Sequence, residues 1–168
     1  MDGLTVRPAT AADLARITEI YNHYIVHTPA TFDLEPWTAT QREEWFTHYD
    51  DDGPHRVFVA EEAGSALGAA WSSSYRPKRA YDTTVETSVY CAPEATGRGI
   101  GRALYTTLFA ILAEEPGLHR AIAAITQPNE ASMALHRSFG FTTAGTTTQV
   151  GFKFDQYWDV TLLERRLP

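Results

Sequence analysis

Two hydrophobic patterns alternate along this chain, and together they predict its secondary structure. In some segments apolar residues recur every three or four positions, as on one face of a helix; in others they form short runs or alternate with polar residues, as in strands. The expected helices span residues 13–27, 40–49, 100–114 and 130–139. The expected strands span residues 4–7, 57–61, 66–74, 83–90, 121–126, 146–152 and 157–167.

Polar residues mark the ends of the first two helices. Thr10 is expected to cap the first helix, with Asp13 in its first turn. Thr40 and Glu43 have the spacing of a capping box at the start of the second helix. The acidic segment 50–54 contains glycine and proline, and it is expected to be a solvated turn that ends this helix.

The order of these elements predicts the fold class. Helices 100–114 and 130–139 each lie between two strands and act as crossover connections. We therefore expect an α/β (α+β mixed) protein, with a mixed sheet and helices on both of its faces. The length of 168 residues suits a single domain spanning residues 1–168, and 43% hydrophobic with 21% charged residues is ordinary for a globular core.

Charge and cysteine content narrow the classes of function. A net charge of −7 argues against sequence-independent binding to nucleic acid or to an anionic membrane, because both require a basic surface. No apolar run reaches the length of a membrane helix, and the first residues do not read as a signal segment. The only cysteine, Cys91, excludes an internal disulfide and fits a reducing compartment, so a cytoplasmic location is expected.

The segment 85–104 places a strand, a glycine-rich turn and the start of a helix in direct succession. Gly97, Gly99 and Gly101 carry no Cβ, so several backbone N–H groups can approach one anion. The helix that begins near Ile100 adds the positive end of its dipole. The segment is therefore typical of a phosphate-binding turn, although a tight connection without a ligand would have a similar sequence.

Two common phosphate-binding folds fit this turn poorly. A nucleotide-triphosphate loop needs Lys followed by Ser or Thr after its last glycine, whereas here Arg102 and Ala103 follow. A dinucleotide-binding fold needs G-x-G-x-x-G and an acidic residue at the end of the next strand. This chain has G-x-G-x-G instead, and its next strand ends in Gln127-Pro128.

The strand end Val89-Tyr90-Cys91 and the turn 96–101 resemble the GNAT family of acetyl-CoA-dependent N-acetyltransferases. In that family a Val-x-Val-like strand end precedes a pyrophosphate loop that reads Arg/Gln-x-x-Gly-x-Gly/Ala. Thr96 stands where the family usually has Arg or Gln, so this side-chain contact is expected to be missing or to come from Arg98. The resemblance also implies a twisted central sheet that is mixed but mostly antiparallel.

A second motif, in segment 129–141, resembles the part of these enzymes where Asn and Ser flank the CoA arm. His136 stands at the position where the family usually has a tyrosine whose hydroxyl faces the thiol. Asn129 is also adequate as a simple helix cap. The resemblance implies that acetyl-CoA is bound by Val89, Tyr90, Cys91, Gly97, Arg98, Gly99, Ile100, Gly101, Arg102, Asn129 and Ser132.

Segment 76–90 narrows the resemblance to the phosphinothricin and methionine sulfoximine acetyltransferase branch. That branch has basic-x-basic-x-Ala-Tyr before Thr-Val-Glu-x-x-Val-Tyr, and the likeness extends over nearly the whole chain. It implies that Arg76 and Lys78 hold the acidic groups of an amino-acid substrate, that Phe32 and Tyr81 shape the pocket, and that the protein is a homodimer. Lys78 replaces the usual arginine, which leaves the preferred substrate open.

Glu86 is the candidate general base, because an amine is protonated at neutral pH and must lose a proton before it attacks a thioester. Strand alternation places Glu86 on the same face as Thr84 and Ser88. His136 could protonate the departing thiolate or shuttle a proton. Structural alternatives are an ion pair for Glu86 and a hydrogen bond to the backbone for His136. No metal is expected, because His23 and His27 have no apparent third ligand.

The sequence therefore predicts an N-acetyltransferase that moves the acetyl group of acetyl-CoA directly to the α-amine of a small amino acid or analogue. Alternatives are a protein N-terminus or another amine as acceptor, and a non-catalytic acyl-CoA-binding module. The basic cluster at positions 76–79 disfavours polyamine acceptors.

Overall fold

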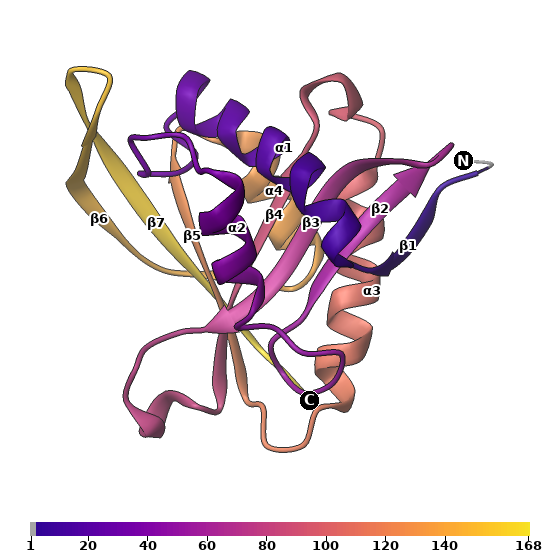
Figure 1. Cartoon of the computed structure of the whole chain (residues 1–168). Helices are drawn as coiled ribbons and strands as arrows, with labels where there is room; N and C mark the ends of the chain where they lie inside the picture. The colour runs from indigo at the N-terminus through magenta and orange to yellow at the C-terminus, as the bar shows by residue number, and fades with distance from the viewer. Residues whose placement is uncertain (1–2) are drawn as a thin grey trace.

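The computed structural model describes residues 3–168, in which one seven-stranded sheet is covered by α-helices on both faces (Figure 1). The strands are β1 (Thr5–Pro8), β2 (Val57–Glu62), β3 (Ser65–Ser74), β4 (Thr84–Cys91), β5 (Arg120–Gln127), β6 (Thr142–Lys153) and β7 (Gln156–Arg166). The α-helices are α1 (Leu14–His27), α2 (Ala39–Phe46), α3 (Ile100–Glu114) and α4 (Glu130–Ser138). None of these helices is long and apolar enough to cross a membrane.

The sheet is mixed but mostly antiparallel, as predicted. Its strand order is β1-β2-β3-β4-β5-β7-β6, and β4 and β5 form its parallel pair. Their pairing runs only from Thr84↔Arg120 to Glu86↔Ile122, although β4 continues to Cys91 and β5 to Gln127. The two strands therefore separate in the middle of the sheet, immediately after Glu86.

The two faces of the sheet carry different helices. Helices α1 and α2 cover one face, where Ile17 of α1 is buried in a cluster with Val59 and Trp71. Helices α3 and α4 pack on the opposite face, where Leu108 and Met133 belong to the larger apolar cluster. Both helix-covered faces remove apolar side chains from water, which is the main force that stabilises such a layered fold.

The second helix begins earlier than the sequence predicted. Its N-cap is Thr38, which forms a capping box with Gln41, rather than Thr40 with Glu43. The side chain of Asn22 on α1 donates to the carbonyl of Trp37 and accepts from its N–H. This long-range anchor fixes the chain one residue before the cap, so the helix starts there.

Candidate active site

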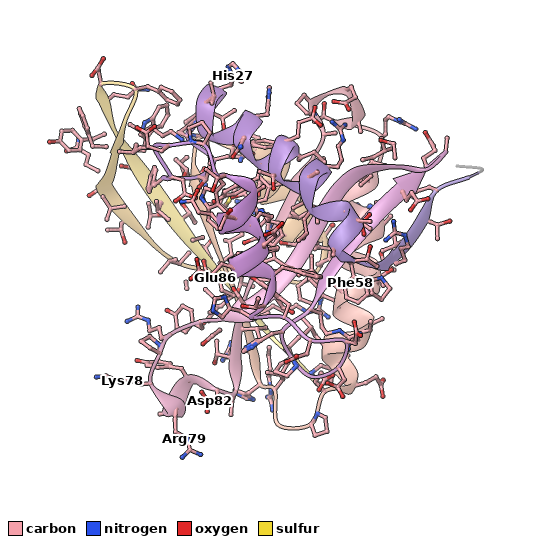
Figure 2. The ribbon with its side chains drawn as sticks, in the orientation of Figure 1. His27, Phe58, Lys78, Arg79, Asp82 and Glu86 are labelled. Atoms are coloured by element: carbon pink, nitrogen blue, oxygen red, sulfur yellow. The ribbon has the colours of Figure 1, made fainter. Side chains whose placement is uncertain are left out.

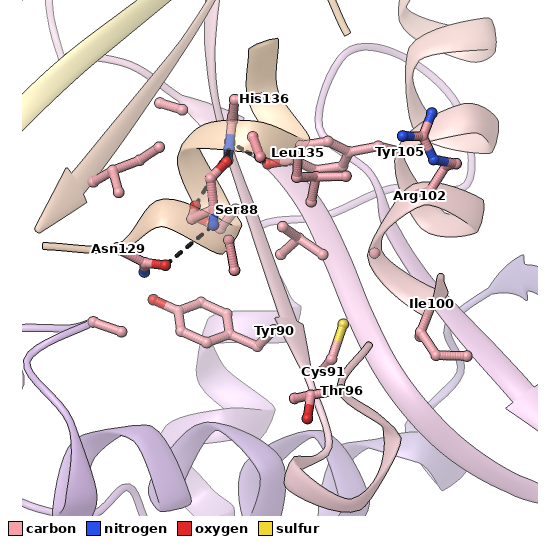
Figure 3. A pocket seen from close by; sticks show the side chains of 18 of the residues that line it. Ser88, Tyr90, Cys91, Thr96, Ile100, Arg102, Tyr105, Asn129, Leu135 and His136 are labelled. Atoms are coloured by element: carbon pink, nitrogen blue, oxygen red, sulfur yellow. Dashed lines mark hydrogen bonds between the residues drawn. The ribbon is translucent and has the colours of Figure 1, made fainter. Parts of the chain in front are cut away.

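A cavity of about 450 Å³ lies where β4 and β5 separate (Figure 3). It is bounded by the second halves of these two strands, the glycine turn, the start of α3 and helix α4. The predicted cofactor-binding residues that line it are Val89, Tyr90, Cys91, Gly97, Gly99, Ile100, Gly101, Arg102, Asn129 and Ser132. The structure thus brings two segments that are far apart in the sequence into one site.

The three glycines of the turn have two different physical roles. Gly97 and Gly99 have φ values of 75° and 78°, in the left-handed region that side chains disfavour. Gly99 is the N-cap of α3, so the N–H groups of the first helical turn have no acceptor within the helix. Gly101 is needed for packing instead, because a Cβ there would lie 3.1 Å from the side chain of Leu135 on α4.

The two arginines of the turn point to different partners. The Arg98 guanidinium binds both carboxylate oxygens of Glu62, at 2.9 and 2.8 Å, and Arg98 does not line the cavity. Arg102, one helical turn later, does line it. The Thr96 hydroxyl donates to the carbonyl of Pro93 at 3.0 Å. Of the two arginines predicted to bind the cofactor, Arg102 is therefore the one that lines the cavity.

Glu86 occupies the last paired position before the strands separate. Its neighbours along β4, Val85 and Thr87, are buried, whereas Glu86 is half-buried and points to the opposite face, as alternation predicted. Ser88, two residues further on that face, lines the cavity. Burial raises the pKa of the Glu86 carboxyl. Glu86 thus stands just outside the cavity, with a carboxyl group that gains a proton more readily than an exposed one.

His136 is enclosed at the end of the cavity that α3 and α4 form, with only 3% of its surface exposed. Its Nδ1 lies 2.8 Å from the carbonyl oxygen of Ser132, and its Nε2 lies 2.9 Å from the hydroxyl of Tyr105 (Figure 3). A carbonyl only accepts, so Nδ1 carries the hydrogen and the Tyr105 hydroxyl donates to Nε2. Burial lowers the pKa of His136, so the ring is neutral at neutral pH.

Two tyrosines of the site were missed by the sequence analysis. Tyr105 lies one helical turn after Gly101, on the same face of α3, so its spacing from the glycine turn was an available signal. Tyr24 also lines the cavity, and its hydroxyl donates to the carbonyl of Cys91 at 2.7 Å. Tyr24 lies on α1, 67 residues before Cys91, so no local pattern placed it at the cavity.

The predicted acceptor residues lie outside the cavity. Arg76, Lys78 and Tyr81 belong to the loop between β3 and β4, which projects from the body of the molecule (Figure 2). Figure 2 shows Lys78 and Arg79 pointing outward, away from Glu86. The Arg76 guanidinium lies over the rings of Tyr75 and Tyr81, 5.0 and 5.7 Å from their centroids. The structure therefore does not bring the basic cluster and the cavity together.

The surroundings of His23, His27 and Cys91 do not favour metal binding or covalent catalysis. Within residues 3–168 no group of three His, Cys, Asp or Glu side chains is placed to hold a metal ion. The rings of His23 and His27 lie side by side, with centroids 4.8 Å apart. Burial raises the pKa of the Cys91 thiol to about 11, which keeps it protonated and a poor nucleophile at neutral pH. The Asn129 side chain accepts from the N–H of Ser132 and so also caps α4.

Comparisons with known proteins agree with this arrangement. The chain matches a family model described as an acetyltransferase (GNAT) domain over residues 6–162. It is 54% identical over 164 residues to a phosphinothricin N-acetyltransferase of Streptomyces coelicolor, covering 96% of this chain and 95% of the relative. It is 38% identical over 164 residues to an L-methionine sulfoximine/L-methionine sulfone acetyltransferase of Salmonella typhimurium, covering 98% and 95%.

A solved structure gives the same result. The crystal structure of a GNAT superfamily phosphinothricin acetyltransferase from Sinorhizobium meliloti in complex with acetyl-CoA superposes with a TM-score of 0.90, at 35% identity and covering 98% of this chain and 89% of that one. The resemblance to this branch is thereby confirmed. Because the family model spans most of the chain and the relatives match nearly all of it, the chain belongs to the GNAT family of acetyltransferases.

Proposed function

We propose that this protein transfers the acetyl group of acetyl-CoA to the α-amine of a small amino acid or analogue of the phosphinothricin and methionine sulfoximine type. One observation carries the proposal: the parallel strands separate directly after Glu86, and the cavity that opens there ends at the glycine turn. The Glu86 carboxyl group thus lies just outside a cavity whose wall includes the glycine turn, which would bind the anionic groups of the donor. The names of the relatives support the class of acceptor.

The donor would be held mainly by backbone groups. The N–H groups at the start of α3 have no acceptor within the helix, and the left-handed Gly97 and Gly99 keep this turn open to a pyrophosphate. Arg102 adds a positive charge on the same wall. Asn129 and Ser132 of the second segment also line the cavity. Bound in this way, acetyl-CoA supplies a thioester carbonyl as the electrophile.

Glu86 would accept the proton of the acceptor's ammonium group. Its raised pKa makes it a stronger base than an exposed carboxylate. His136 and Tyr105 would serve the leaving thiolate as a hydrogen-bonded pair. The Tyr105 hydroxyl, which donates to Nε2 of His136 in the resting site, would turn to give its proton to the thiolate, and the tyrosinate left behind would regain a proton from solvent.

The acceptor's acidic groups would be bound by Arg76 and Lys78, and Phe32 and Tyr81 would contact the rest of the acceptor. The loop that carries the two basic residues is exposed, and it leads directly into β4 and Glu86. We further propose that the protein acts in the cytoplasm, where its single cysteine would stay reduced.

A panel of acceptors tests the proposal. The purified protein is mixed with acetyl-CoA and methionine sulfoximine, methionine sulfone, phosphinothricin, spermidine or a short peptide, and free CoA thiol is measured. We expect release of CoA with the first three and little with spermidine. Turnover of spermidine or the peptide alone would contradict the amino-acid assignment, and a lack of turnover with any amine would contradict the enzymatic one.

Variants of Lys78 test the acceptor site separately. Lys78→Arg is expected to lower the KM for phosphinothricin, because a guanidinium can bind its acidic group through two parallel hydrogen bonds whereas an ammonium is a point charge. Lys78→Ala should raise that KM. Both variants should leave the affinity for acetyl-CoA unchanged, and the equally exposed Arg79→Ala is the control.

A further inference from the structure

The ring of Phe32 occupies the space that a side chain on Gly151 would need. A Cβ on Gly151 would lie 2.1 Å from two carbons of the Phe32 ring and 2.7 Å from a third. The φ of Gly151 is outside the left-handed region, so its backbone conformation does not call for glycine. Gly151 is thus required by the neighbouring ring, which comes from a loop more than a hundred residues earlier in the chain.

A second residue on the same face of β6 holds the same loop. Lys153 is 4% exposed, and its Nζ donates to the carbonyl oxygen of Thr31 at 2.8 Å. Residues two apart in a strand point to the same side, so Gly151 and Lys153 present one surface to the loop between α1 and α2. On that surface Gly151 contacts Phe32, and Lys153 contacts Thr31, the residue before Phe32.

The loop is also fixed from its other side. The hydroxyl of Tyr21 donates to the Asp33 carboxylate at 2.8 Å and lies 2.9 Å from the hydroxyl of Thr31. The indole Nε1 of Trp37 donates to the same carboxylate at 2.8 Å. Both neighbours of Phe32 are therefore anchored, while 36% of Phe32 itself remains exposed. The ring has a fixed position and an open edge.

We propose that Gly151 and Lys153 are positioning residues that set the specificity for the acceptor by fixing the Phe32 ring. The inference rests on the proposed function, in which Phe32 packs on the body of the acceptor. A ring held in place before binding loses little conformational freedom when the acceptor arrives, so its contact contributes fully to affinity. A displaced ring would weaken acceptor binding and leave the acetyl-CoA site unchanged.

The substitution Gly151→Ala tests this directly, with Gly145→Ala as the matched control. Gly145 lies on the same strand, its φ is also outside the left-handed region, and a Cβ there would meet nothing within 4 Å. We expect Gly151→Ala to lower kcat/KM for methionine sulfoximine by about 10- to 100-fold, mainly through KM, with unchanged acetyl-CoA affinity. Gly145→Ala should behave as wild type. An unchanged acceptor KM in folded Gly151→Ala would overturn the proposal.

Combining Gly151→Ala with Phe32→Ala separates positioning from a general loss of structure. Without the ring the new methyl group has space, so adding Gly151→Ala to Phe32→Ala should change neither the acceptor KM nor the Tm further. Equal effects of Gly151→Ala with and without the ring would overturn the proposal. The Tm values can be measured without an acceptor. If Gly151→Ala and Phe32→Ala are coupled in Tm but the wild type turns over no acceptor, the contact between Gly151 and Phe32 is established and the proposed function is contradicted.

Lys153→Met gives an independent measurement, because methionine keeps most of the apolar stem and removes the donor to the Thr31 carbonyl. The expected result is a several-fold higher acceptor KM, in the same direction as for Gly151→Ala, with unchanged acetyl-CoA affinity. A Lys153→Met protein with the wild-type acceptor KM would show that Lys153 does not position the loop.

Discussion

Glu86 is half-buried at the point where two strands separate, and this environment determines the pH range in which it can accept a proton. Burial disfavours the charged form of a carboxyl group, so the pKa of Glu86 lies above that of an exposed glutamate. The carboxylate is the form that accepts a proton. Activity should therefore decline as the pH falls through this raised pKa.

The first prediction is that Glu86→Gln lowers turnover by about 10²–10⁴, the usual contribution of a positioned base. The amide has the same shape but cannot accept the proton, so acetyl-CoA affinity should not change. The acidic limb in the kcat/KM profile of the wild type should disappear in the variant. Glu43→Gln, on the exposed side of α2, is the control. An acidic limb that persists in Glu86→Gln would place the base elsewhere.

At the residue scale, sequence reasoning succeeded where chemistry is local. The glycine turn and the face of β4 that carries Glu86 follow from spacing and alternation, and both lie where they were expected. The ion pair of Arg98 with Glu62 was not predicted, because Glu62 lies 36 residues earlier and no local pattern reveals the contact. The contact of Tyr105 with His136 joins two helices and was equally invisible.

Among the elements, the turn before α3 combines a left-handed glycine backbone with the anion-binding role proposed for it. Gly97 and Gly99 have left-handed φ values, and a Cβ at either would meet nothing within 4 Å. A substitution there acts through the backbone rather than through a clash, because a left-handed conformation costs about 1–2 kcal/mol for a residue with a Cβ. The turn would relax and move the N–H groups.

The second prediction follows from that movement: Gly99→Ala should raise the Kd for acetyl-CoA about tenfold or more and leave the acceptor KM nearly unchanged. Isothermal titration calorimetry measures the first and steady-state kinetics the second. Gly64→Ala is a close control, since Gly64 has a φ of 80° and open surroundings but lies in the turn between β2 and β3. An unaltered Kd in Gly99→Ala would mean that the turn does not bind the donor.

The third prediction concerns the junction of β1 and α1, where Asp13 is 8% exposed. Its two carboxylate oxygens each accept from the Arg7 guanidinium at 2.8 Å, and Oδ2 also accepts from the N–H of Thr10 at 2.7 Å. The arginine hydrogen bonds hold the pKa of Asp13 below its ordinary value. A depressed pKa stabilises the fold above the unfolded-state pKa, and this contribution is lost as the pH falls through the folded-state pKa.

Asp13→Asn should therefore lower the free energy of unfolding by about 1–3 kcal/mol at pH 7. The difference from wild type should begin to shrink as the pH falls below the unfolded-state pKa of about 4, and it should be lost once the pH has passed through the lower folded-state pKa of Asp13. Urea unfolding at several pH values measures both effects. Asp51→Asn, in the exposed turn after α2, should change neither. A difference between Asp13→Asn and wild type that is independent of pH would assign the loss to packing instead of charge.

The order and type of the elements were largely predictable, because helices such as residues 100–114 have strong periodicity and clear boundaries. The residue that caps each helix was less predictable. Thr38 and Thr40 are both reasonable caps, and the contact of Asn22 with Trp37, fifteen residues away in the chain, selects the first. Local propensity does not distinguish two equally good caps, and tertiary contacts determine which of them is used.

For the molecule as a whole, the mixed sheet with helices on both faces followed from the alternation of strands and helices. The separation of β4 and β5 could not be predicted in this way. It depends on where the parallel pairing ends, and that pairing joins residues 36 apart in the sequence. The place of Phe32 against the hairpin of β6 and β7 was also beyond local pattern. Both features bring distant segments together, and both lie at or beside the proposed site.

The β6–β7 hairpin also has an exposed surface that could join two copies of the chain. Strand β6 is an edge of the sheet, and Figure 1 shows the β6–β7 hairpin extending away from the body. The aromatic side chains of Phe152 and Tyr157 near its tip are 55% and 64% exposed. An edge strand next to exposed aromatic residues is suited to pairing with a second copy, in which the same surface supplies both halves of the interface.

The fourth prediction is therefore that the protein is a homodimer through this hairpin. Sedimentation equilibrium at micromolar concentration should give twice the mass of the chain for the wild type. Phe152→Glu with Tyr157→Glu should give the monomer mass, because two buried carboxylates per chain would be costly in such an interface. Val26→Glu, at a half-exposed position on α1, should leave the dimer intact. A monomeric wild type, or a double variant that remains dimeric, would rule out this interface.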